Sequence, residues 1–215
     1  MIKISLISLL IIFSCNSSGS NKIIENFTSK SDSFEQDIPE LMKDNDYKNL
    51  LESVENGLGL SSIKHGFNKF QIRVWEEKNK VGQVIVLVNS GKGWSGNLYD
   101  FKYTRVNNQK VDKVMGSRSP MDTPISGWDK MLNNLYDLDI LTLRDYSSIP
   151  NYDVATDVDQ GYAVELAGIN KYRSYTYPQP EAMQKSVPEA EKMLEIIQLL
   201  DKEFRLNNFM KRKTN

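Results

Sequence analysis

Alternating apolar and polar positions mark six segments of the chain as β-strands. The segments fall into a first group of four, separated by short turn-rich connections, and a later pair. Short connections favour antiparallel neighbours, because parallel strands need crossovers of a dozen or more residues. The sequence therefore predicts an antiparallel meander followed by a hairpin, with strands over residues 70–76, 81–89, 98–106, 109–115, 162–167 and 172–177.

Apolar residues at helical spacing predict three helices beside these strands. The first follows the N-capping residues 44–46 and ends at Gly57, and the second begins at Trp128. The third is a long C-terminal helix that opens at Pro188 and carries an apolar face through Phe204. We expect residues 45–215 to form a single α+β domain, an antiparallel sheet of about six strands packed with helices.

The first fifteen residues have the order of an export signal. Lys3 supplies a positive charge, an apolar run follows, and Ser14 precedes Cys15, the only cysteine of the chain. The apolar run is shorter than the roughly 20 residues that a membrane-spanning helix needs. We expect residues 1–14 to be a signal peptide, and the alternative is a buried core element with Cys15 as an ordinary thiol.

The residues Ile12, Phe13, Ser14 and Cys15 resemble the lipobox of bacterial lipoproteins. Ser14 fits the small residue before the cleavage site, whereas bulky Phe13 departs from the usual pattern. The resemblance implies that Cys15 is acylated and that the lipid bilayer is a partner of the protein. It also implies a place in the cell envelope, on the periplasmic or surface side of a bacterial membrane, with the outer membrane favoured in a Gram-negative host.

Residues 15–44 are predicted to be the lipidated cysteine and a flexible tether. The apolar residues Ile23, Ile24, Phe27 and Phe34 show no sustained period in this polar segment. A coil of about 28 residues has a root-mean-square reach of about 30 Å, which would lift a domain clear of the headgroups. The alternative is a poorly patterned first strand within the same segment.

The composition argues against nucleic acid as a partner and against catalytic sites that need histidine or cysteine. The chain has 27 Lys and Arg against 28 Asp and Glu, so it has no strong field to attract nucleic acid, and we expect none as a partner. His65 is the only histidine and fits a solvated turn, while Cys15 is assigned to lipid. Zinc and a Ser-His-Asp site are therefore not expected. We predict no catalytic residue set, metal or cofactor.

Three further patterns do not define a site. Residues 91–96 match G-x-G-x-x-G, but a strand follows them in place of the helix that would hold a pyrophosphate, so they predict a hairpin loop. The aspartates at positions 153, 157 and 159 lack the spacing of a calcium loop. Carboxylates could meet in space for acid–base chemistry, but no spacing selects a pair among Glu76, Glu77, Asp137, Asp139, Asp145 and Glu165.

Aromatic residues and arginines alternate along three of the predicted strands. Tyr, Trp and Arg concentrate binding energy at interfaces because they combine a large apolar area with a polar group. If their faces coincide, the sheet has an interaction surface; if Met193, Leu194 and Ile197 of the last helix cover them, they are core. The candidate residues are Arg73, Trp75, Tyr99, Phe101, Tyr103, Arg173, Tyr175 and Tyr177.

Segments 94–99, 126–128 and 172–178 resemble motifs of exported bacterial lipoproteins without an assigned activity. This resemblance carries no catalytic residue and therefore implies no mechanism. The sequence favours a membrane-anchored, noncatalytic binding or interaction module with an envelope protein or glycan as partner. The alternative is a carboxylate-dependent hydrolase of the cell envelope.

Overall fold

The computed structural model describes residues 19–27, 33–38, 45–106, 110–153 and 160–206. The predicted signal peptide and Cys15 lie outside these ranges, as do the aspartates at positions 157 and 159. Within the described residues, no helix combines the length and the apolar character needed to cross a membrane.

The described strands form a seven-stranded sheet in the order β1-β7-β6-β2-β3-β4-β5. All neighbouring strands are antiparallel except β1, which pairs in parallel with β7. The predicted α+β class and mostly antiparallel sheet are confirmed, with seven strands in place of about six. The strands are β1 (Glu35–Asp37), β2 (Phe70–Lys78), β3 (Val81–Asn89), β4 (Trp94–Val106), β5 (Lys110–Met121), β6 (Gln160–Gly168) and β7 (Lys171–Pro178).

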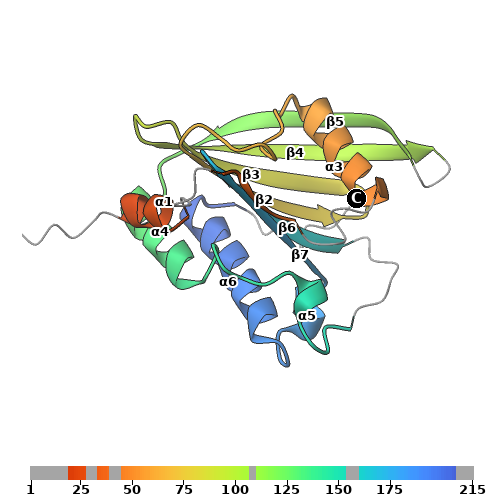
Figure 1. The fold of residues 1–215 in the computed structure, drawn as a ribbon. Coiled ribbons are helices and arrows are strands. Elements are labelled where there is room, and N and C mark those ends of the chain that lie inside the picture. Colours follow the sequence, from red (N-terminus) through yellow and green to blue (C-terminus); the bar gives the residue numbers. More distant parts are fainter. Residues whose placement is uncertain (1–18, 28–32, 39–44, 107–109, 154–159, 207–215) are drawn as a thin grey trace, which may run out of the picture.

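Helices lie on both faces of this sheet (Figure 1). One face carries α1, α4, α5 and α6, and the other carries α3. The first two predicted helices correspond to α3 and α4. The last one, α6, ends at Glu203, and Phe204, the end of its predicted apolar face, is the C-cap. The described helices are α1 (Gly19–Phe27), α3 (Asn45–Leu58), α4 (Trp128–Asp137), α5 (Pro180–Met183), α6 (Pro188–Glu203) and the 3-10 turn η1 (Tyr146–Ser148).

The pleat of the strands divides the interior into two apolar layers. On β2, Ile72 and Val74 pack with α4 and α6, whereas Trp75 packs with Leu51 and Val54 of α3. The larger layer lies under α1, α4 and α6, and the smaller one lies under α3. The strands β2, β3 and β6 therefore bury both of their faces, and α3 covers the second face.

Two segments of the predicted tether belong to the folded body. Residues 19–27 form α1, whose Ile23 and Phe27 are buried in the larger apolar layer. Residues 35–37 form β1 and extend the sheet beside β7. The tether prediction is wrong for these segments. Two apolar residues one helical turn apart are too few to show a period in the sequence, but their burial packs this short helix against the core.

Residues 91–93 of the G-x-G-x-x-G match form the turn between β3 and β4, as their context predicts, whereas residues 94–96, expected in the loop, already pair with β3 as the start of β4. Gly91 and Gly93 have φ values of 84° and 129°, which residues other than glycine rarely adopt. The side-chain oxygen of Asn89 accepts a hydrogen bond of 2.8 Å from the backbone N–H of Gly91. The glycines therefore serve the turn.

Candidate functional site

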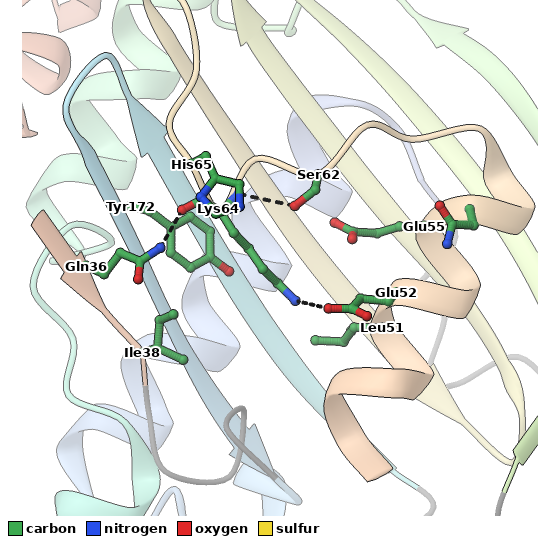
Figure 2. A pocket seen from close by; sticks show the side chains of 10 residues that line it. Gln36, Ile38, Leu51, Glu52, Glu55, Ser62, Lys64, His65 and Tyr172 are labelled. Atoms are coloured by element: carbon green, nitrogen blue, oxygen red, sulfur yellow. Dashed lines mark hydrogen bonds and ion pairs between the residues drawn. The ribbon is translucent and has the colours of Figure 1, made fainter. Parts of the chain in front are cut away.

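A pocket of about 580 Å³ opens beside α3, between this helix, the segment 60–66, the edge strand β1 and its neighbour β7. Figure 2 shows its side chains converging from these four elements. The lining combines acids, bases, amides and apolar groups. It consists of Gln36, Ile38, Leu51, Glu52, Glu55, Asn56, Ser62, Lys64, His65 and Tyr172.

Arg73 lies at the centre of a buried polar cluster beneath this pocket. Its side chain is 2% exposed, and its Nη1 lies 2.6 Å from Oε1 of Glu55. Its Nη2 donates a hydrogen bond of 2.5 Å to the backbone carbonyl of Ser61. Because Glu55 also lines the pocket, Arg73 connects the pocket wall to the sheet.

Glu165 is the second carboxylate of the cluster. Its Oε2 lies 3.9 Å from Nη1 of Arg73 and accepts a hydrogen bond of 2.8 Å from the indole N–H of Trp75. Its Oε1 accepts a hydrogen bond of 2.6 Å from the hydroxyl of Tyr172. Both oxygens of this fully buried carboxylate therefore have donors, which fixes its position.

The register of the sheet explains why these residues meet. Arg73 on β2 stands directly opposite Glu165 on β6, and Ala167 of β6 stands opposite Tyr172 on β7. Residues two apart on a strand share a face, so Trp75 joins Arg73, and Tyr172 joins the same side of the sheet. The helix α3 then brings Glu55 onto this face.

The cluster holds two carboxylates against one guanidinium. The pKa of Glu55 is raised to about 7, chiefly because burial disfavours its charged form and secondly because Glu165 repels it. Arg73 and Lys64 oppose this rise in the pKa. Glu55 therefore exchanges its proton near neutral pH.

Polar contacts also fix the rim of the pocket. Nζ of Lys64 lies 3.4 Å from a carboxylate oxygen of Glu52, and the amide of Gln36 donates a hydrogen bond of 2.7 Å to the backbone carbonyl of Lys64. His65 is exposed on the rim, as expected of a turn histidine. The rim therefore joins β1, the segment 60–66 and α3.

The eight candidates for an interaction surface do not lie on one face. Five lie under α3, whereas Arg173, Tyr175 and Tyr177 point to the opposite face, because their positions on β7 alternate with that of Tyr172. Seven of the eight are buried, and Arg173 is half-buried. The five under α3 are Arg73, Trp75, Tyr99, Phe101 and Tyr103, so α3, and not the last helix, covers them.

Sequence reasoning named part of this site and missed the rest. Arg73 and Trp75 were candidates for a surface, and Glu165 was one of six acids with no assigned partner. Glu55 was missed, although it follows Leu51 by four residues and Val54 by one, which places an acid beside the apolar stripe of α3. An acid in that position is the signal that could have found it.

The pKa of Glu55 makes stability depend on pH. Its carboxyl binds a proton more strongly when folded, with a pKa of about 7, than when unfolded, with a value near 4.5. Its contribution is therefore complete below about pH 4.5 and is lost as the pH rises toward and through 7.

We expect Glu55→Gln to become increasingly stable relative to the wild type between pH 5 and pH 8. Urea unfolding of both proteins across this range checks the prediction. Parallel stability curves for the two proteins would show that Glu55 titrates normally.

Among the described residues, no group of three His, Cys, Asp or Glu side chains is arranged to hold a metal ion. The site is a polar pocket with a titratable carboxyl group, that of Glu55, on its wall. No protein-family model matches the chain, and no curated protein or solved structure gives a significant match.

Proposed function

We propose that the protein is a membrane-anchored lipoprotein of the cell envelope, and that it acts as a noncatalytic binding module whose ligand occupies the pocket beside α3. One observation carries the binding proposal: Glu55 lies on the pocket wall and is held from behind by the buried Arg73. Binding sites typically combine apolar walls with a few fixed polar groups, and this pocket has that composition.

The energetic cost of the cluster supports a functional role. Apolar residues of similar volume often replace a buried ion pair without loss of stability, and sometimes with a gain. Here the chain keeps two carboxylates and a guanidinium under α3, each 5% exposed or less. Preorganised charges next to a pocket are what ligand recognition requires.

A pocket-filling substitution tests this proposal. Ligand-detected NMR of the full chain against a library of envelope-derived small molecules, glycan fragments and peptides should find binders, and Asn56→Trp at the pocket should abolish their signals. Glu195→Trp, at an exposed position of α6, is the matched control and should leave them unchanged. Binders that persist in Asn56→Trp would place the ligand elsewhere.

The lipid anchor at Cys15 is the second part of the proposal, and the lipobox-like residues 12–15 support it. A cysteine with two or three acyl chains gives stable membrane attachment, because each buried methylene contributes about 0.8 kcal/mol. We expect Cys15→Ser to lose radioactive palmitate and to move from the membrane fraction to the soluble fraction. Undiminished label in this variant would refute the anchor.

Because α1 begins at Gly19, the linker between the proposed anchor and the folded body is shorter than the sequence predicts. Four peptide units separate Cys15 from Gly19, where α1 begins, and an extended chain of this length spans at most about 14 Å. This replaces the reach of about 30 Å expected of a long tether. An acylated Cys15 would therefore hold the α1 end of the folded body close to the lipid headgroups.

One observation favours the alternative function, a carboxylate-dependent envelope hydrolase. A pKa of about 7 suits Glu55 to general acid–base chemistry at neutral pH. Envelope glycans and model esters incubated with the full chain provide the test. Turnover that Glu55→Gln abolishes and Glu195→Gln leaves intact would favour the enzyme over the binding module.

A further inference from the structure

The charges around the pocket do not balance. Within the described part of the chain, the carboxylates of Glu52, Glu55 and Glu165 face the cationic groups of Arg73 and Lys64. The acids exceed the bases by one when all five groups are ionised and the imidazole of His65 on the rim is neutral. A single positive charge inside the pocket would balance them.

The excess charge falls on Glu55. Glu52 is paired with Lys64, and Glu165 has donors on both of its oxygens. Arg73 holds only Oε1 of Glu55, and among the described residues no donor contacts its second oxygen. The Glu55 carboxyl group also lies on the pocket wall (Figure 2), so a ligand can reach it.

The remaining lining defines the rest of such a ligand. Ile38, Leu51 and the ring of Tyr172 offer apolar contact, while Gln36 and Ser62 offer hydrogen bonds at the rim. The cationic groups of Arg73 and Lys64 already have acidic partners, and the exposed imidazole of His65 lies on the rim. An anionic ligand would therefore meet an excess of negative charge, and a cation with an organic body would not.

We propose that the pocket binds a small organic amine whose ammonium group pairs with Glu55. This inference rests on the proposed binding function and names its ligand class. Without a ligand at neutral pH, the Glu55 carboxyl group is protonated in a fraction of the protein molecules, and this proton removes the excess negative charge. Binding releases this proton to solvent, and the ammonium group takes its place against the carboxylate. Affinity therefore rises with pH while the amine stays protonated.

Calorimetric titration of the full chain in detergent with three matched probes tests the proposal. The probes are phenethylammonium, the neutral 2-phenylethanol and the anionic phenylacetate. We expect phenethylammonium to bind at least 10-fold more tightly than the other two, and its affinity to increase between pH 6 and pH 8. Titrations in buffers of different ionisation enthalpy should detect proton release that is larger at pH 6 than at pH 8.

Two variants make the result specific. Glu55→Gln should lower the affinity for phenethylammonium at least 10-fold and abolish the proton release, whereas Glu195→Gln on α6 should change neither. Preserved unfolding curves confirm that each variant folds. Tighter binding of phenylacetate or 2-phenylethanol, lost in Asn56→Trp, would overturn the amine proposal and leave the binding function standing. If no probe binds and the library screen also finds no binder, both proposals fail.

Discussion

Replacing Arg73 with methionine is expected to lower the free energy of unfolding by about 3 to 5 kcal/mol at pH 8. The substitution removes the only described cation in contact with both Glu55 and Glu165 and leaves two buried carboxylates facing each other. Methionine fills a similar volume, so the loss reports the missing charge more than a cavity. Urea unfolding with the linear extrapolation method measures it.

The double variant Arg73→Met with Glu55→Met is the control for this prediction. It removes the unbalanced carboxylate together with its partner, and apolar replacement of a buried pair is often neutral or stabilising. We expect the double variant to regain at least half of the stability that Arg73→Met loses. Additive losses would mean that the two side chains do not interact energetically.

Replacing Ile197 with alanine is expected to cost about 2 to 5 kcal/mol, as large-to-small changes do in well-packed cores. Ile197 is buried on α6 and belongs to the larger apolar layer, together with Ile72 and Leu132. The cost therefore tests whether α6 closes the sheet. Urea unfolding of the full chain gives the difference in midpoint.

The control for this variant is Glu195→Ala, two residues away on the exposed side of α6. An exposed substitution in a helix normally changes stability by less than about 0.5 kcal/mol. Equal midpoints for Ile197→Ala and the wild type would mean that α6 stands apart from the core.

Strong local patterns predicted much of the sheet. The strand at 81–89 coincides with β3, because its apolar run ends at turn residues on both sides. β5 runs on to Met121, well past the predicted end at 115, since pairing with β4 holds polar residues that have no strand pattern of their own. The helix α1 was missed because its burial depends on α4 and β2, and a nine-residue segment shows too little period to predict it.

The candidate site was harder to predict than the fold. Period-two alternation gives the side on which a residue lies within its own strand, but it does not give the register between strands. Arg73 and Glu165 therefore appeared in the sequence as separate candidates, and only their pairing across β2 and β6 makes them one cluster. For the same reason, the sequence analysis grouped Tyr175 with Trp75 in one candidate surface, although the two lie on opposite faces of the sheet.

The proposed binding of an amine requires Glu55 to carry an unbalanced charge on the wall of the pocket. Titration of its carboxyl carbon by NMR in the full chain, with Glu55→Gln to assign the signal, measures the protonation of this group itself. We expect a midpoint near pH 7, and a lower midpoint when phenethylammonium saturates the pocket. A midpoint near 4.5, the ordinary value for this carboxyl group, would contradict this expectation.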